Sequence, residues 1–432
     1  MTRKINYRFP DPIYGIIEVP DWLSEIDNLE PVRRMMFIRQ LGLKAYIDFP
    51  GAIHTRYAHV LGVMHLAGKM VDILHREQTQ QGRVHISENL KNNKNTIMAA
   101  AFLHDIAHGP FSHALDYVIT SLGGKGHEQM ASDIITNDLG ILEDYGIPLR
   151  SVIKIINDEH NYPFISGIVN GPLDADKLDY LLRDSHNIGY RYSFDLEHFI
   201  NLYTIIGDDR KLEECLLGLI NSDEAVVTAE IFTLIWKSMY ELVYYKENSR
   251  IAEKMLEKAT IRASRDTSTI FSDTKKYIGL DDERLLNELG KIDGYPSRIV
   301  KGIRKRDLFE KQYEFKLDEQ NIGSMPKLLS KDPNEISEKT TIQLCSDLKI
   351  EEYSLICDLF KSRSPKKMHI FDPNDPEEPM DIRSRSEIIN SIKPRTFLKI
   401  YKDKEVHIPL TQEELNARVY TILEGVLEGI PG

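Results

Sequence analysis

Apolar residues recur at helical spacing over most of the first 290 residues of the chain. The sequence PVRRMMFIRQLG predicts a helix from Pro31 that ends at Gly42, and YAHVLGVMHLAGKMVDILHRE predicts one that follows Thr55 as its N-cap. The run TIMAAAFLHDIAHG is apolar nearly all round, which predicts a buried helix that stops at Gly109-Pro110. A helical body is therefore expected.

The same spacing predicts further helices over Glu128–Ile135, Leu149–Asp158, Asp174–Arg183 and Glu224–Ala263. The polar stretch 78–95 is expected to be a loop followed by the start of a helix. Segment 267–294 is more polar, and we expect it to remain helical.

The sequence pattern at both ends of the chain differs from the helical spacing of the central part. The proline-broken sequence RFPDPIYGIIEVPDW (8–22) predicts a short hairpin or extended arm. Near the C-terminus, 313–320, 340–348 and 396–410 are expected to be strands, and EEYSLICDLF (351–360) is expected to be a helix. The remaining two segments are predicted as a loop, FDPNDPEEPMD (371–381), and a Thr-capped amphipathic helix, 411–430.

These elements predict a mainly α protein with three parts. We expect an N-terminal β-arm at 1–30, a helical body at 31–290 and a smaller C-terminal α+β domain at 291–432. Of the 432 residues, 41% are hydrophobic and 28% charged, as is ordinary for a globular protein.

The charge balance narrows the ligands that the chain is expected to bind. Lys and Arg number 55 against 67 Asp and Glu, so the formal net charge is -12. An acidic chain repels nucleic acid at long range, although a local basic groove can still hold a nucleotide. Nucleic acid is therefore not the favoured partner.

Cysteine usage and the hydropathy of the N-terminus indicate the compartment. Cys215, Cys345 and Cys357 form no CxxC pair, which disfavours a disulfide scaffold or a zinc ribbon. The N-terminal residues MTRKINYRFPDP carry no apolar signal region, and no run approaches the roughly 18 apolar residues that a membrane span needs. We expect a cytoplasmic protein with no membrane partner.

The segment HDIAHGPFSH (104–113) is the strongest candidate for chemistry. His104 and Asp105 lie in an apolar run, where an imidazole and a carboxylate are costly to bury unless they are paired or bind a metal. On a continuous helix His108 would lie one turn below His104, and Gly109-Pro110 would then turn His113 back toward the site. A single histidine is usually a satisfied core or surface residue, but three with an aspartate in one short apolar element predict a site.

Two other segments supply candidate partners for this cluster. HTRYAH carries Arg56 and His59 at the start of a helix, and GPLDADKLDYLLRDSHNIGY carries several charges. A solvated helix face accounts well for Asp179 and Arg183. It accounts less well for Asp176, because the start of a helix allows this residue to point inward.

Taken together, these segments resemble the HD superfamily of metal-dependent phosphohydrolases. The motifs FIRQLG, FPGAIHTRYAHVLGV, FLHDIAHGPFSH, HEQM and DADKLDYLLRDSHNIG resemble its deoxynucleoside triphosphate triphosphohydrolase branch. The resemblance covers roughly Asp11 to Ala263, and the rest matches only the position of that branch's smaller C-terminal domain.

The resemblance implies one divalent metal ion, whose ligands would be His59, His104, Asp105 and Asp176. Two imidazoles and two carboxylates suit Mn, Fe, Zn, Ni or Mg, so the metal's identity stays open. The resemblance also implies catalytic roles close to the metal for His113, His127, Glu128 and Asp105.

The residues expected to bind substrate fall into two groups. Phosphate oxygens would be held by Arg56, His108, Lys177 and Tyr180. The sugar and base would be held by Gln40, Leu41, Asp184 and Tyr244. Without the resemblance, Leu41 and Tyr244 could equally be core residues.

Several positions depart from the triphosphohydrolase pattern. Trp236 stands where that branch places a phosphate-binding arginine on its long helix. One phosphate contact is therefore lost, or is supplied by Lys237, Lys246 or Arg250. The positions of the branch's guanine-nucleotide activator site also differ, so GTP activation is not expected; these are Tyr7, Arg8, Arg33 and Met36.

The expected function is metal-dependent hydrolysis of deoxynucleoside triphosphates to deoxynucleoside and tripolyphosphate. One alternative is an HD phosphohydrolase that acts on another nucleotide or phosphoester, such as a nucleoside monophosphate or a nucleic-acid end. Another is a helical module that uses the metal only for structure or senses nucleotides, which the presence of His113, His127 and Glu128 disfavours. By resemblance, the protein is expected to be a homo-oligomer, either a dimer or a tetramer.

Overall fold

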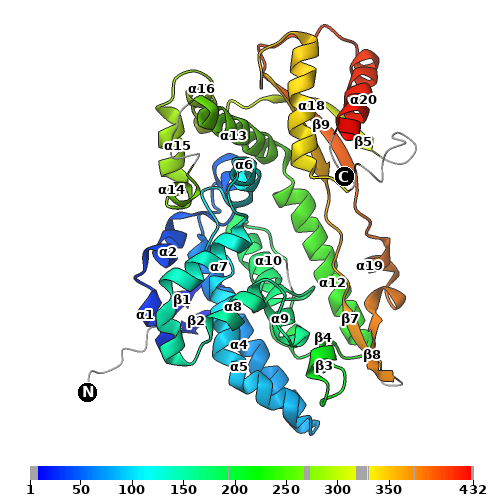
Figure 1. Ribbon diagram of the computed structural model, residues 1–432. Helices are drawn as coiled ribbons and strands as arrows, with labels where there is room; N and C mark the ends of the chain where they lie inside the picture. The colour runs from blue at the N-terminus through cyan, green and yellow to red at the C-terminus, as the bar shows by residue number, and fades with distance from the viewer. Residues whose placement is uncertain are drawn as a thin grey trace.

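Two long neighbouring helices, α4 and α5, run along the centre of the helical body (Figure 1). Helix α4 spans Arg56–Gln80 and α5 spans Val84–Leu103, so only three residues join them. The Thr55 hydroxyl accepts a hydrogen bond from the backbone N–H of Ala58, which confirms the predicted N-cap. The computed structural model describes residues 8–192, 194–266, 273–317, 328, 330–372 and 375–429.

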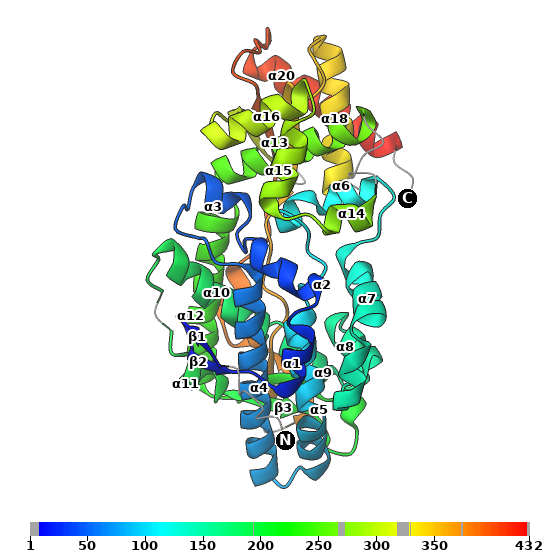
Figure 2. The same cartoon turned by 90° about the vertical axis from the view of Figure 1, so that its left-hand side faces the viewer.

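Other helices pack around this pair and extend the molecule upward from it in Figure 1. Figure 2 shows the same elongated shape, with α18 and α20 at the end opposite the α4–α5 hairpin. The remaining helices of the body are α1 Asp21–Ile26, α2 Glu30–Arg33, α3 Leu43–Ile47, α6 Asp116–Ser121, α7 His127–Asp138, α8 Leu149–Ile156, α9 Pro163–Asn170, α10 Ala175–Ile188, α11 Leu196–Ile200, α12 Asp223–Met239, α13 Glu247–Asp266, α14 Thr274–Ile278, α15 Asp282–Gly290 and α16 Tyr295–Lys305.

Within the described part of the chain, three small sheets complete the fold. Strands β1 (Arg8–Asp11) and β2 (Gly15–Glu18) form the predicted N-terminal hairpin. Strands β5 (Glu310–Leu317), β9 (Thr396–Lys402) and β6 (Leu355–Lys361) form an antiparallel sheet in that order. The C-terminal helices are α18 Pro333–Leu348, α19 Glu387–Ser391 and α20 Gln412–Gly429.

The third sheet joins the body to the C-terminal part of the chain. Its strand order is β3 (Tyr203–Ile206), β4 (Leu216–Leu219), β7 (His369–Asp372) and β8 (Asp375–Asp381). Strands β4 and β7 are parallel, with Leu219 opposite Ile370. Ile370 is fully buried in the same core as α4 and α5, so the chain returns to the helical body after building the other sheet.

This architecture confirms the expected mainly α fold with an N-terminal β-arm and a smaller C-terminal α+β region. Among the described residues, no helix combines the length and the apolarity that crossing a bilayer requires. Some predicted positions lie outside the described residues, namely Tyr7, 267–272, 318–320, 373–374 and 430.

The helices predicted from Pro31 to Gly42 and over 224–263 differ from those in the structure. The helix from Pro31 stops at Phe37, because Ile38 and Arg39 are extended and pair with the chain just before α4. Gly42 does not cap that helix, but precedes α3 with a φ of 48° that favours glycine. The predicted 224–263 helix is interrupted by a π-helical turn at Tyr240–Tyr244, which separates α12 from α13.

Three C-terminal predictions were wrong. Residues 340–348 belong to helix α18, which Asp332 caps and Pro333 begins, and 351–360 contains strand β6 instead of a helix. The apolar run of β6 is buried along almost its whole length, and such a run has no period that separates strand from helix. Residues 371–381 form most of the β7–β8 pair, and β8 tolerates its prolines because it is an edge strand.

A buried ion pair fastens the C-terminal sheet to the body. The Arg250 guanidinium on α13 donates to both carboxylate oxygens of Asp358 on β6, at 2.5 and 2.7 Å. The Asp358 side chain is fully buried and also accepts a bond from Tyr401 at 3.2 Å. Burial alone would raise the pKa of Asp358, but Arg250 and Lys254 outweigh it and hold that pKa below its ordinary value.

We expect Asp358→Asn to lower the free energy of unfolding by about 3 kcal/mol near neutral pH, because it leaves a buried guanidinium without its anion. The pKa of Asp358 is lower in the folded chain than in the unfolded chain. The stabilisation is therefore present above the unfolded pKa of about 3.9 and is lost as the pH falls through the folded pKa. Denaturant unfolding between about pH 2 and 7 should show a weaker acid dependence in the variant.

Asp223→Asn is the matched control, since Asp223 also accepts a bond from an arginine, Arg385, but its side chain is 97% exposed. The control should change stability little at any pH. Equal losses in the two variants would contradict the assigned importance of the buried pair.

Candidate metal centre and active site

The ends of three helices bring the four predicted metal ligands together. His59 lies in the first turn of α4, His104 and Asp105 follow directly after α5, and Asp176 lies in the first turn of α10. The His59 Nε2 atom is 3.1 Å from Asp176 Oδ1, and His104 Nε2 is 3.7 Å from the same oxygen. Asp105 closes the group, with one carboxylate oxygen 3.3 Å from His104 Nε2 and the other 3.8 Å from His59 Nε2.

A buried carboxylate behind the cluster orients His59. Asp179 Oδ2 is 2.8 Å from His59 Nδ1, on the opposite side of the ring from Asp176. Arg183 pairs with both oxygens of Asp179, at 2.8 and 2.9 Å, and also donates to Asp11 of the N-terminal hairpin at 2.7 Å. These charges are buried, so the solvated-face interpretation of Asp179 and Arg183 was wrong.

The close approach of α4 and α10 requires a glycine. A Cβ atom built on Gly62 would lie 1.9 Å from Asp179 Oδ1 and 2.3 Å from Arg183 Nη2. Since Gly62 is one turn after His59 on α4, the absence of a side chain there lets Asp179 reach the imidazole.

Electrostatics favour a cation in the middle of this cluster. Burial disfavours a charged His59, but hydrogen bonds to Asp176 and Asp179 outweigh it and raise the pKa of His59 to about 10. Burial would likewise raise the pKa of Asp105, yet Arg56, His104 and His108 hold that pKa well below its ordinary value. Hydrogen bonds from His104 and His59 also outweigh burial and lower the pKa of Asp176. Both carboxylates therefore stay ionised at a buried site, which can hold positive charge.

The donor set fits a divalent metal ion. One ligand atom each from His59, His104 and Asp176 lies within 4.8 Å of the other two. Imidazole nitrogens and carboxylate oxygens are the ligands of the first-row divalent metals, and Asp179 holds the outer nitrogen of His59 as metal-binding histidines commonly require. His59, His104, Asp105 and Asp176 can therefore hold such an ion, which would polarise a bound phosphoryl group.

His108 lies beside the cluster in a turn, not on a helix. Helix α5 ends at Leu103, so the predicted one-turn spacing of His108 below His104 was wrong. His108 Nε2 is 3.3 Å from Asp105 Oδ1. Burial and the nearby Arg56 lower the pKa of His108 to about 3, so its ring is neutral and able to donate one hydrogen bond.

A second carboxylate, Asp116, organises the two predicted catalytic histidines. Asp116 Oδ2 is 3.0 Å from His113 Nδ1 and 3.7 Å from His127 Nδ1. Among the described residues, Asp116 is thus the carboxylate within 4 Å of the His127 ring, and Glu128, which was expected to have a catalytic role, is exposed. The sequence alone did not single out Asp116, although its spacing of three residues from His113 was an available signal.

Burial would raise the pKa of Asp116, but the hydrogen bond from His113 outweighs it and lowers the pKa to about 2. His113 faces water on its other side, with 63% of its side chain exposed. An ionised Asp116 on Nδ1 leaves Nε2 as the atom that can exchange a proton with a ligand.

The residues expected to hold the nucleoside line one cavity of about 510 Å³ next to the cluster. Asp184 lies inside the protein, where it bonds His54 Nε2 at 2.7 Å and accepts a bond from the Tyr244 hydroxyl at 2.7 Å. Gln40 keeps a buried amide oxygen that has no hydrogen-bond partner among the residues that the structure describes. The structure brings together in this cavity Gln40, Leu41, Arg56, Tyr180, Asp184 and Tyr244.

The residues expected to hold phosphate lie on both sides of the cluster. Arg56 donates to Asp105 and, at 2.7 Å, to Ser112. Lys177 donates to Asp174 at 2.5 Å and to the Gly171 carbonyl at 3.0 Å, and lines a second cavity of about 340 Å³ with His108. Both cavities include His113, Asp105 and Asp176, so they meet at the cluster.

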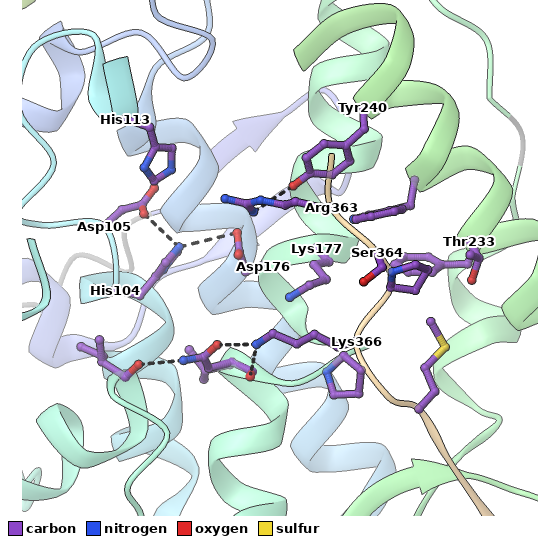
Figure 3. Close-up of a pocket in the computed structure, with 18 of the residues that line it drawn as sticks. His104, Asp105, His113, Asp176, Lys177, Thr233, Tyr240, Arg363, Ser364 and Lys366 are labelled. Carbon is purple, nitrogen blue, oxygen red and sulfur yellow. Dashed lines mark hydrogen bonds and ion pairs between the residues drawn. The ribbon is translucent and has the colours of Figure 1, made fainter. Parts of the chain in front are cut away.

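The lining of the second cavity shows which residues lie near the α12 position where the triphosphohydrolase pattern places an arginine. Trp236 lines this cavity, while Lys237 faces Glu241 at 3.6 Å and lines another hollow. Arg250 is already engaged by Asp358, and Lys246 lines none of the described cavities near the cluster. The sequence analysis missed Arg363 and Lys366, which enter the cavity from the C-terminal part of the chain (Figure 3).

Two protein families match this chain, each over a different range of residues. The family described as "HD domain" matches residues 56–184, and the family described as "HD associated region" matches residues 197–405. The first match ends at Asp184 and contains all four candidate metal ligands. The second includes the segment that carries Arg363 and Lys366.

Curated relatives of this chain include proteins with a named activity. The chain is 30% identical over 329 residues to the deoxynucleoside triphosphate triphosphohydrolase SAMHD1 homolog of Dictyostelium discoideum, a match that covers 72% of this chain and 60% of that protein. It is 28% identical over 398 residues to deoxynucleoside triphosphate triphosphohydrolase SAMHD1 of Homo sapiens, covering 79% and 60% of the two chains. The chain thus spans 60% of the length of each relative.

A solved structure supports the fold over nearly the whole chain. The crystal structure of a hypothetical protein from Aquifex aeolicus has a TM-score of 0.69 and 21% sequence identity to this chain. The match covers 97% of this chain and 100% of that one. The likeness includes both the helical body and the C-terminal part.

We expect His104→Ala to remove the bound metal ion from the purified protein. Loss of one imidazole from this set should weaken metal binding by more than the roughly 10- to 100-fold that loss of a supporting residue costs. Inductively coupled plasma mass spectrometry of the wild-type protein and the variant measures the metal content directly. His198→Ala is the control, because His198 lies on α11 and pairs with Glu224 away from the cluster. A variant at His104 that keeps the wild-type metal content would contradict this assignment.

Proposed function

Because the chain belongs to the HD superfamily of phosphohydrolases, we propose that it hydrolyses deoxynucleoside triphosphates to deoxynucleosides and tripolyphosphate. The observation that carries the proposal is the junction of two cavities at the metal-binding cluster. One cavity is lined by residues that suit a nucleoside, and the other by cations that suit phosphates. Two relatives named as deoxynucleoside triphosphate triphosphohydrolases support the same substrate class.

The nucleoside end of the substrate would be bound by polar groups that are already held in place. Asp184 accepts bonds from His54 and Tyr244, and its carboxylate lines the cavity, where it can accept a bond from a sugar hydroxyl. The unpaired amide oxygen of Gln40 can accept another. The Tyr244 ring, 5.8 Å from the Tyr180 ring, narrows the space beside the sugar and so favours a deoxyribose.

The reaction forms a bond between water oxygen and the α-phosphorus and breaks the bond from that phosphorus to O5′. The bound metal ion would polarise the phosphoryl group and help to activate the water. His113 would donate the proton that the departing O5′ requires, from Nε2, while Asp116 on Nδ1 stabilises the charged imidazolium. Arg56, His108 and Lys177 would bind phosphate oxygens, and Asp105 would hold both the metal and Arg56.

Trp236 favours one alternative function. Its indole occupies the α12 position where the triphosphohydrolase pattern places an arginine. A substrate with fewer phosphates does not need a phosphate contact at this position. The alternative is therefore a phosphohydrolase that acts on a nucleoside monophosphate or on a nucleic-acid end.

The products of the reaction separate these functions. We expect metal-loaded protein, incubated with each dNTP and NTP, to release tripolyphosphate and deoxynucleoside from dNTPs, as measured by ion-exchange chromatography. Orthophosphate from monophosphates, with dNTPs left intact, would overturn the proposal and support the alternative.

A variant of the nucleoside cavity tests the substrate orientation. We expect Asp184→Asn to lower kcat/KM for dNTPs by about tenfold or more, because a charge-assisted hydrogen bond to the sugar is lost. Metal content should stay at the wild-type level. Glu213→Gln, an exposed carboxylate elsewhere on the surface, is the control and should leave kcat/KM unchanged. Wild-type kcat/KM in the Asp184 variant would contradict the assigned role of this cavity.

A further inference from the structure

The segment between β6 and β7 forms one wall of the cavity that contains the metal-binding cluster. It lies more than 170 residues after Asp176 in the sequence, yet Arg363, Ser364, Pro365 and Lys366 line the same cavity as His104 and Asp176. Figure 3 shows Arg363 extending from this segment toward Asp176. The C-terminal part of the chain therefore contributes directly to the candidate active site.

Contacts to the helical body hold Arg363 at this position. Its Nη1 atom donates to the Tyr240 hydroxyl at 3.1 Å, and its guanidinium lies 5.7 Å from the centre of that ring. The backbone N–H of Arg363 donates to the Tyr245 hydroxyl at 2.9 Å. Both tyrosines come from the junction of α12 and α13, so the π-helical turn there positions this arginine.

Lys366 is held in a similar way at the other end of the segment. Its ammonium group donates to the side-chain oxygen and the carbonyl of Asn170, at 3.2 and 3.3 Å. Neither cation has an anionic partner: among the residues that the structure describes, no carboxylate oxygen lies within 4.0 Å of Arg363 or Lys366. Neutral oxygens anchor both side chains and leave their charges uncompensated.

A third cation, Lys177, faces the same space from α10 (Figure 3). Desolvation and the nearness of Lys177 lower the pKa of Lys366 below its ordinary value, as expected when two ammonium groups share a small cavity. Lys177 is paired with Asp174 at 2.5 Å, so Arg363 and Lys366 are the two cations here that lack a carboxylate partner among the described residues. Like charges that face one another across a cavity favour an anion between them, and the space therefore suits an anionic ligand.

We propose that Arg363 and Lys366, together with Lys177, form an anion subsite that binds the terminal phosphates of a polyphosphate substrate. This inference rests on the proposed function, because it assigns the phosphates beyond the reacting one to this wall of the cavity. The planar guanidinium can hold two phosphate oxygens at once, and the lysines neutralise the rest of the charge. In this chain the C-terminal segment supplies the cation that α12 lacks at Trp236.

The subsite predicts a preference for triphosphates over monophosphates. A monophosphate engages only the cluster formed by His59, His104, Asp105 and Asp176, whereas a tripolyphosphate chain reaches the three additional cations. Arg363 and Lys366 should therefore affect KM, and leave kcat nearly unchanged once substrate is bound.

Isothermal titration calorimetry of the full chain with inorganic tripolyphosphate and with orthophosphate tests the subsite without any need for turnover. We expect Arg363→Ala and Lys366→Ala each to weaken tripolyphosphate binding about tenfold, because each removes a charge-assisted contact worth about one factor of ten. Orthophosphate binding should change little. Lys367→Ala is the matched control, since Lys367 is the adjacent exposed lysine and does not line the cavity.

Arg363→Gln keeps a donor for the Tyr240 hydroxyl and loses the charge, so it separates a loss of charge from a disturbed segment. It should weaken tripolyphosphate binding as much as Arg363→Ala does. Wild-type affinity for tripolyphosphate in the Arg363 and Lys366 variants would overturn the subsite.

Steady-state kinetics with dNTPs then distinguishes failure of the subsite from failure of the proposed function. A raised KM with nearly constant kcat in the two alanine variants supports both. Hydrolysis of dNTPs with unchanged KM in these variants supports the function and overturns the subsite. Tripolyphosphate binding that depends on Arg363 and Lys366, in a wild-type protein that hydrolyses no dNTP, supports the subsite and overturns the function.

Discussion

The buried carboxylate of Asp179 is the constraint on which the geometry of the candidate site depends. An ionised group inside a protein must be paired, and Asp179 is paired twice, with His59 and with Arg183. Both partners can reach it only because Gly62 lets α4 and α10 approach closely. The same approach sets the first turns of the two helices side by side, and there His59 meets Asp176. The packing of α4 against α10 therefore also brings the metal ligands together.

The network continues outward from that point and explains why the N-terminal arm is ordered against the body. Arg183 extends from Asp179 to Asp11, and the Tyr14 hydroxyl donates to Asp179 at 2.8 Å. The small β1–β2 hairpin has little core of its own, so these buried polar contacts fix its place. A similar charge pair, Arg250 with Asp358, fixes the C-terminal sheet at the other end of the molecule. Both appendages are attached through arginine–carboxylate contacts to the helices that build the cavities.

Much of the fold and the metal-binding cluster could be predicted from the sequence, because both follow from local patterns. Helical spacing located α4 and α10, and the unusual density of polar residues in an apolar segment singled out His104 and Asp105. The C-terminal part was harder to predict. Strand β6 carries apolar residues at successive positions because both of its faces are buried, and such a run does not distinguish strand from helix. Residues 38–40 look helical in isolation but pair with the chain before α4.

The residues that the sequence did not reveal are those whose role depends on distant contacts. In sequence, Arg363 and Lys366 belong to a short basic stretch that is typical of an exposed loop. Their approach to the cluster depends on Tyr240, Tyr245 and Asn170, which no local pattern links to them. The parallel pairing of β4 with β7 adds to this dependence, because it inserts residues after 368 into a sheet that begins near 203. A chain cut between α15 and α16 would lack strands β7 and β8 of the sheet that begins with β3, and would also lack one wall of its cavity. Recombination between related genes at that point would therefore join sheet strands and cavity walls that come from different proteins.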